Sequence, residues 1–149
     1  MPDSTQDTLN HMDKVRARLL EMQHGLMVRG IEHDASKLEE PEKTGYDQLT
    51  ADLKDIVYGS DEYRAALAAA KPIIEHHYAH NSHHPEHYEQ GIVGMSLLDI
   101  VEMLCDWKAA SERTKQGSIM QSLAHNKTRF GIDDQLAAIL ENTVKELGW

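Results

Sequence analysis

A histidine and an aspartate stand side by side at His33 and Asp34, directly after an apolar segment and before a new start at Ala35. An imidazole nitrogen and a carboxylate oxygen on adjacent residues can bind one divalent ion, and this pairing suits zinc, iron, manganese or nickel better than calcium. Two ligands do not complete a metal site, so further ligands must come from elsewhere in the chain. The alternative is that Asp34 only caps a short helix through Lys37.

The segment from His76 to His87 holds six of the ten histidines in the chain. Neither helix propensity nor core packing requires this density, so we interpret it as chemical. His76, His80 and His83 have helical spacing and would share one face of a continuous helix, whereas His77 points elsewhere. One of His76 and His77 is expected to be a ligand and the other a neighbour, while His80 and His87 are expected to be solvated.

The elements that must position these side chains are predicted to be helices, because the apolar residues recur at helical spacing and no stretch alternates like a strand. The first helix is expected to start near Thr5. The later helices are expected at Tyr46–Ile56, from Ser60 through a kink at Pro72 to about His80, Ser96–Arg113, Ser118–Phe130 and Asp133–Leu147, with an exposed connection around Pro41 and Gly45.

The first helix also carries His11, a further possible ligand. A straight helix would hold His11 roughly 30 Å from His33, at a rise of 1.5 Å per residue. The metal interpretation therefore requires a turn near His24 and Gly25, which would fold the chain back toward His11. Taken alone, a histidine such as His11 is more often half-buried on a helix than a metal ligand.

Two acidic residues lie one turn apart in the most apolar of the predicted helices, at Glu102 and Asp106. A bare charge among apolar neighbours is costly, and a metal or a nearby histidine would offset that cost. The structural alternative is an Asp106 carboxylate paired with a lysine or histidine. The only cysteine, Cys105, lies in the same apolar run and is expected to be a buried structural thiol.

A length of 149 residues fits one domain, and the formal charge of −10 argues against nucleic acid or an anionic membrane as the main partner. An anionic small substrate would need a local positive centre. The N-terminus lacks a signal peptide pattern, and no apolar run reaches membrane-spanning length, so we expect a cytoplasmic protein. The methionine-rich helices could bury one another within a monomer or across a homodimer.

The ordered set of His11, His33, Asp34, Lys37 and Asp106 resembles the pattern of the HD-domain metal-dependent phosphohydrolase superfamily. The resemblance implies an all-α fold, here a single HD-like helical bundle over residues 1–149. The chain is also similar to a smaller HD-like family of phages and bacteria, through further segments: His76-His77 with Asn81, His83-His84, and Glu102-Met-x-x-Asp106-Trp107.

The resemblance further implies a divalent transition metal, Mn, Fe, Co, Ni or Zn, in one or two copies. The ligands that it implies for the first ion are His11, His33, Asp34 and Asp106. Members of the superfamily with extra histidines bind two metals, and the candidates for a second site here are His77, His83 and His84.

A bound ion would make hydroxide available near neutral pH and neutralise a phosphoryl oxygen. The expected catalytic residues are Asp34, Lys37 and Glu102, with Glu102 orienting a ligand histidine or accepting a proton. Lys37 and Arg64 are the candidate phosphate contacts, and the alternative for both is an ordinary surface charge.

Three functional classes follow from these observations. The first is a metal-dependent phosphohydrolase that uses metal-activated water on a small phosphorylated molecule, a nucleotide by analogy with the superfamily. The second is a dinuclear iron oxygenase on the same scaffold. The third is a non-catalytic metal-binding or partner-binding protein, in which the histidines hold the loop from Asn81 to Gly91 in shape.

Overall fold

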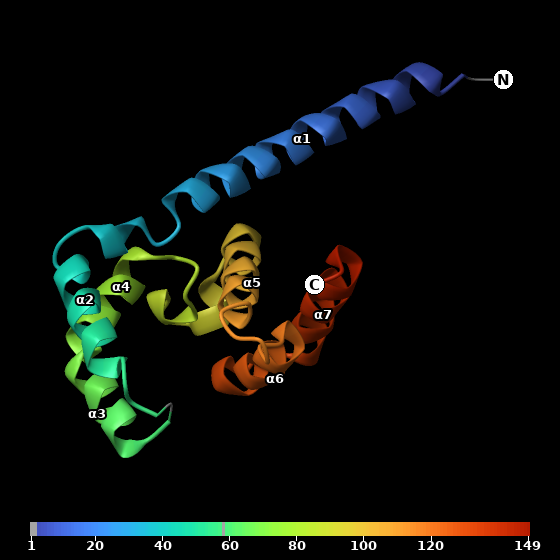
Figure 1. Ribbon diagram of the computed structural model, residues 1–149. Helices are drawn as coiled ribbons and strands as arrows, with labels where there is room; N and C mark the ends of the chain where they lie inside the picture. The colour runs from blue at the N-terminus through green and yellow to red at the C-terminus, as the bar shows by residue number, and fades with distance from the viewer. Residues whose placement is uncertain (1–2, 58) are drawn as a thin grey trace. The chain divides into compact units, whose positions relative to one another are not determined.

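The computed structural model describes residues 3–57 and 59–149 of the chain. The described residues form seven α-helices, three short 3-10 helices and no strand, which confirms the all-α prediction (Figure 1). They divide between His33 and Asp34 into two compact units, which are described separately. The single HD-like domain expected over residues 1–149 stays a prediction.

The first unit consists of one long helix, α1 (Thr5–Glu32). It begins where the sequence predicts, but the turn expected at His24 and Gly25 is wrong, because α1 is continuous through both residues. A glycine inside a helix costs only about 1 kcal/mol relative to alanine, which neighbouring helix formers can offset. No α1 residue is buried, and the helix exposes a series of large apolar side chains: Leu9, Met12, Val15, Leu19, Leu20, Met22, Met27 and Ile31.

The second unit begins with a 3-10 helix, η1 (Ala35–Leu38), followed by α2 (Glu42–Leu53). Helix α2 starts four residues earlier than the predicted Tyr46, so Gly45 lies inside a helix and not in an exposed connection. A Cβ atom on Gly45 would lie 2.7 Å from Cγ2 of Ile73, so the absence of a side chain at Gly45 allows α2 to approach α4 closely.

The sequence predicts one helix with a kink at Pro72. The structure has two helices instead, α3 (Asp61–Ala69) and α4 (Lys71–His80), which meet at Ala70. Proline is tolerated in the first turn of a helix, so Pro72 here accompanies a new helix start. The helix start expected at Ser60 is confirmed, since the Ser60 hydroxyl caps α3 and accepts a hydrogen bond from the Tyr63 amide at 3.1 Å. Helix α4 ends at His80, as the sequence predicts, so the condition for His83 to share a face with His76 and His80 is not met.

A loop with two 3-10 turns, η2 (Pro85–His87) and η3 (Gly91–Gly94), leads to α5 (Leu97–Ser111). Buried Asp99 joins this loop to the start of α5. Its carboxylate accepts hydrogen bonds from the Ser82 and Tyr88 hydroxyls, both at 2.8 Å. It also accepts from the Ser96 amide and hydroxyl, at 2.8 and 2.7 Å, in a capping box.

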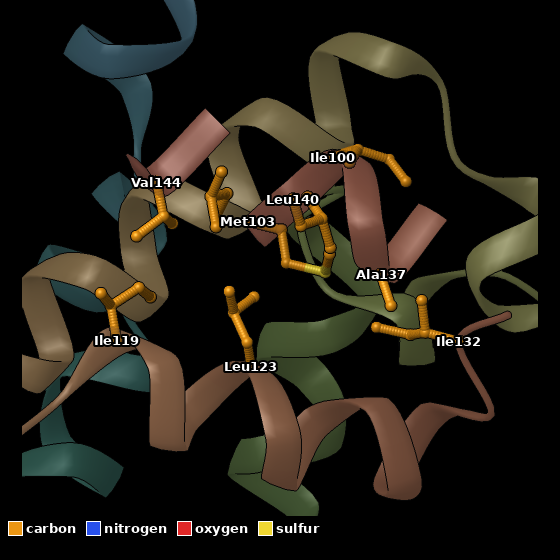
Figure 2. Packing of buried hydrophobic residues seen from close by; sticks show 9 residues of the cluster. Ile100, Met103, Ile119, Leu123, Ile132, Ala137, Leu140 and Val144 are labelled. Atoms are coloured by element: carbon orange, nitrogen blue, oxygen red, sulfur yellow. The ribbon is translucent and has the colours of Figure 1, made fainter. Parts of the chain in front are cut away.

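The apolar core of the second unit lies among α5, α6 (Ile119–Phe130) and α7 (Asp134–Leu147), close to the predicted bounds (Figure 2). Its buried members are Ile100, Met103, Leu104, Ile119, Leu123, Ile132, Ala137, Leu140 and Val144. Cys105 is exposed, so the prediction of a buried thiol is wrong. Within the described ranges, no helix has the length and apolar character needed to cross a membrane.

Candidate metal centre

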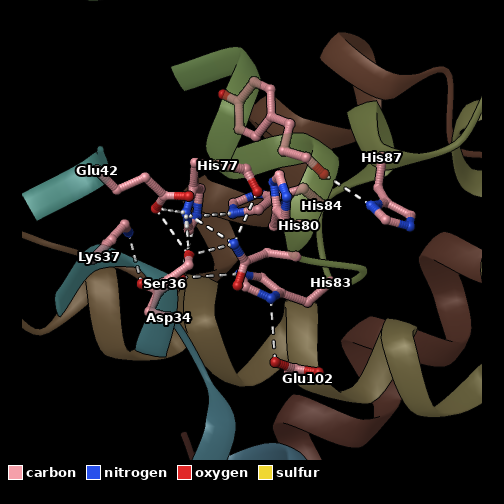
Figure 3. Close-up of polar contacts among 12 residues, drawn as sticks. Asp34, Ser36, Lys37, Glu42, His77, His80, His83, His84, His87 and Glu102 are labelled. Atoms are coloured by element: carbon pink, nitrogen blue, oxygen red, sulfur yellow. Dashed lines mark hydrogen bonds and ion pairs between the residues drawn. The ribbon is translucent and has the colours of Figure 1, made fainter. Parts of the chain in front are cut away.

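Four of the seven side chains that the sequence predicts as metal ligands come together in the second unit (Figure 3). They are Asp34, His77, His83 and His84, and one ligand atom of each lies within 4.8 Å of the other three. His77 Nε2 lies 3.2 Å from Asp34 Oδ1 and 3.0 Å from His84 Nε2. His83 Nε2 lies 3.6 Å from the same Asp34 oxygen.

Asp34 is positioned by the tight turn that opens η1. Its φ angle of 58° lies in the left-handed region, which aspartate adopts more readily than most residues. The Lys37 amide donates to the Asp34 carbonyl at 2.9 Å, and the Lys37 ammonium lies 2.6 Å from Asp34 Oδ2. These contacts hold one carboxylate oxygen on Lys37 and leave Oδ1 facing the histidines.

His77 is positioned by a buried carboxylate on α2. Its Nδ1 atom lies 2.8 Å from Oε2 of Glu42, a residue with no exposed surface. Burial opposes ionisation of Glu42, but the hydrogen bonds from His76, His77 and Ser36 outweigh it and hold the pKa of this carboxyl below its usual value. An ionised carboxylate only accepts hydrogen bonds, so Glu42 favours the His77 tautomer that carries its proton on Nδ1 and turns the Nε2 lone pair toward the cluster.

Asn81 supports the same arrangement from the end of α4. Its side-chain amide donates to Ser36 Oγ and to the His77 carbonyl, both at 2.8 Å. Ser36 Oγ in turn donates to Glu42 Oε2 at 2.8 Å. The η1 turn, the start of α2 and the end of α4 are thereby connected through side-chain hydrogen bonds around one imidazole.

His83 is held in the same way by α5. Its Nδ1 atom lies 3.2 Å from Glu102 Oε1, and the His83 side chain is only 2% exposed. The carboxylate again places the proton on Nδ1 and leaves the Nε2 lone pair facing Asp34. At His84, burial and the neighbouring His83 and His77 lower the pKa to about 3, so this imidazole is neutral at physiological pH.

The chemistry of this donor set fits a divalent transition metal. The Asp34 Oδ1 atom and the Nε2 atoms of His77 and His83 face one another. These atoms are electron-rich, so a cation bound between them would stabilise the arrangement. Three imidazoles and one carboxylate suit zinc, iron, cobalt, nickel or manganese. The carboxylate partners Glu42 and Glu102 are of the kind that metal-binding histidines use to fix their tautomer.

Two of the other predicted ligands, His11 and Asp106, do not belong to this cluster. His33 follows His11 by 22 positions, and the residues between them lie in the continuous helix α1, so the two are about 33 Å apart at 1.5 Å per residue. The two histidines therefore do not share an ion within one chain, which corrects that part of the predicted ligand set. Asp106 lies half-buried on α5, one turn beyond Glu102, and is not one of the four clustered residues.

The predicted substrate contacts differ in their surroundings. Lys37 is 34% exposed and pairs with Asp34, at the edge of the cluster. Arg64 is exposed on α3, where it pairs with Asp61 and donates to the Gly59 carbonyl at 2.7 Å. Its contacts are those of an ordinary surface charge, the alternative that the sequence left open.

Sequence reasoning missed the contact between Glu42 and His77. Glu42 was assigned to an exposed connection, and Ser36 and Asn81 were given no role in holding His77. A glutamate directly after Pro41 is a helix-start signal, because proline is favoured near the first helical position and acidic side chains in the first turn. That signal could have located the start of α2 but not the burial of Glu42.

The chain belongs to a family of unknown function (DUF5662), whose sequence profile matches residues 2–146. No curated protein and no solved structure shows significant similarity to it. The resemblance to the HD-domain superfamily therefore stays an expectation.

Proposed function

We propose that this protein is a metal-dependent phosphohydrolase that acts on a small phosphorylated molecule, a nucleotide by analogy with the HD superfamily, through metal-activated water. The observation that supports the metal dependence is the convergence of Asp34, His77, His83 and His84 in the second unit. The phosphoryl substrate is inferred from the sequence resemblance and from the lysine beside the cluster.

The uneven burial of the cluster favours a catalytic over a structural metal site. His77 and His83 are each only 2% exposed, whereas the side chains of Asp34 and Lys37 are 25% and 34% exposed. Structural zinc sites are closed by four protein ligands, and catalytic sites keep a position open for water or substrate. The Asp34 side of the cluster is the side from which substrate would enter.

When bound, a divalent ion lowers the pKa of a coordinated water and neutralises charge on a phosphoryl oxygen. The Lys37 ammonium has three donors and uses one on Asp34, so it can also donate to a phosphate oxygen. Glu102 orients His83 through Nδ1 and keeps Nε2 available. Asp34 supplies a ligand oxygen and positions Lys37 with its second oxygen.

The test is phosphate release from a panel of nucleotides and sugar phosphates with Mn²⁺, Co²⁺, Ni²⁺ or Zn²⁺ added. We expect turnover by the wild type and a loss of at least about 100-fold in Asp34→Ala, the range expected for a metal-assisted step. Asp55→Ala, at an exposed position near the end of α2, is the matched control and should retain wild-type turnover.

Equal turnover in wild type and Asp34→Ala would contradict the proposal. Metal binding without turnover on any substrate would favour a non-catalytic role, which the burial of His77 and His83 also fits. The dinuclear iron oxygenase is separated from both by metal analysis and an absorption spectrum after anaerobic purification. Monomer and homodimer are distinguished by measuring the molar mass in solution.

A further inference from the structure

Two histidines on the outer face of α4 lie one helical turn apart beside the cluster. The rings of His76 and His80 stack with centroids 4.1 Å apart and planes inclined by 19°. Together with Glu42 they form a second group of possible ligands, with one atom from each residue within 4.8 Å of the others. None of the three belongs to the four-residue cluster around Asp34.

Hydrogen bonds fix the tautomers of both outer histidines. His80 Nδ1 lies 2.8 Å from the His76 carbonyl oxygen, which can only accept. His76 Nδ1 lies 2.9 Å from Glu42 Oε1, a carboxylate oxygen. Both rings therefore carry their proton on Nδ1 and expose the Nε2 lone pair.

We propose that His76 and His80 bind a second divalent transition-metal ion through their Nε2 atoms, in an outer site distinct from the Asp34 cluster. Two histidines at positions i and i+4 of a helix present both imidazoles to one ion, the spacing used by zinc-binding helices. His80 is exposed and the His76 side chain is 35% exposed, so water can complete the coordination. With only two protein nitrogens, the outer site binds more weakly than the inner cluster.

Glu42 connects the outer pair to the inner cluster. Its Oε1 atom contacts His76 and its Oε2 atom contacts His77, so one carboxylate orients an imidazole in each group. An ion on His76 makes the Nδ1 proton a stronger donor, draws the Glu42 charge toward His76 and adds positive charge near the inner ion. Each ion therefore lowers the affinity of the other, and this coupling is reciprocal. The coupling rests on the proposed inner metal site, whereas the outer site does not.

The experiment is calorimetric titration of the metal-free full-length protein with Zn²⁺, for wild type, His80→Ala and His87→Ala. His80 and His87 are both exposed and both bonded through Nδ1 to a backbone carbonyl, so His87→Ala is a matched control. We expect two binding events in the wild type, with the weaker at least about tenfold weaker, and loss of that weaker event only in His80→Ala.

A single event in the wild type, or equal loss of the weaker event in both variants, would overturn the outer site. Persistence of two unchanged events in His80→Ala would overturn it as well. Phosphate release measured on the same preparations separates this result from the proposed function. If the protein binds one Zn²⁺ per chain and releases phosphate, only the outer site is refuted. If it binds two Zn²⁺ per chain and releases no phosphate, only the proposed hydrolase function is refuted.

Discussion

Replacing Glu42 tests the central geometric argument, because this one buried carboxylate holds two imidazole N–H groups. In Glu42→Gln the side chain keeps its shape, but its amide has one acceptor oxygen and one NH₂ group. The oxygen can accept from His76 or from His77 but not from both, and the NH₂ group faces the other N–H. The imidazole that loses its acceptor can move its proton to Nε2, which removes that lone pair from the metal.

The expected magnitude follows from the loss of such a carboxylate partner. Removing the hydrogen-bond acceptor of a metal-binding histidine typically weakens metal binding about 10- to 100-fold. This range corresponds to about 1.4 to 2.7 kcal/mol of binding free energy. A buried donor left without its acceptor also costs about 1 to 3 kcal/mol of folding stability.

The assay is competition for Zn²⁺ or Co²⁺ against a chromophoric chelator, with wild type and Glu42→Gln compared at the same pH. Circular dichroism and urea denaturation establish that the variant is folded at the assay temperature. Glu89→Gln changes the same functional group at an exposed loop position and is expected to leave metal affinity within a factor of two. Glu42→Ala, which removes both acceptors, is expected to weaken binding at least as much as Glu42→Gln.

A folded Glu42→Gln protein that binds metal as tightly as the wild type would refute the reasoning. In that case the tautomer of His77 would not depend on Glu42, and the cluster would need another explanation for its electron-rich centre. Loss of metal binding in the Glu89→Gln control to the same extent would equally remove the argument from the Glu42 contacts.

Three further predictions concern the scaffold and its pH response. Asp99→Asn should cost about 2 to 4 kcal/mol in urea denaturation at pH 7, because the amide cannot accept all the bonds from Ser96 and the loop hydroxyls. Burial opposes ionisation of Asp99, but those bonds hold its pKa well below 3.8, so this stabilisation is complete above that pH and is lost as the pH falls further. Gly45→Ala should lower the free energy of unfolding by about 1 to 3 kcal/mol, because the new Cβ would contact Ile73. In the double variant Gly45→Ala with Ile73→Ala, the loss should be smaller than the sum of the losses in the two single variants. Because the pKa of His84 falls from 6.5 to about 3 on folding, the metal-free wild type should lose stability as the pH falls from 6.5 toward 3, and His84→Gln should show a flatter profile.

Local sequence signals located most of the helices. Ser60 and Ser96 carry cap signals that the structure uses, and α5 to α7 begin and end close to their predicted bounds. These signals can be read from the sequence because a helix cap and the spacing of apolar residues depend only on residues within one or two helical turns. The same local reasoning failed at Gly25, where a tolerable propensity cost did not break α1.

The density of histidines between residues 76 and 87 indicated a chemical site, but not which imidazoles converge. The end of α4 at His80 separates His83 from the helical face and lets the following loop return His83 and His84 toward His77. Spacing along a helix could not predict this arrangement, because it depends on a loop held by Asp99 from another helix.

The sequence by itself determined the helical character of the protein, the acidic balance and the types of side chain available to bind a metal. Tertiary structure decided that Glu42 is buried, that it contacts His76 and His77, and that Glu102 contacts His83. The physical reason is that helix formation follows from neighbouring residues, whereas the tautomer of an imidazole is set by the hydrogen-bonding partner that folding brings to it from a distant part of the chain.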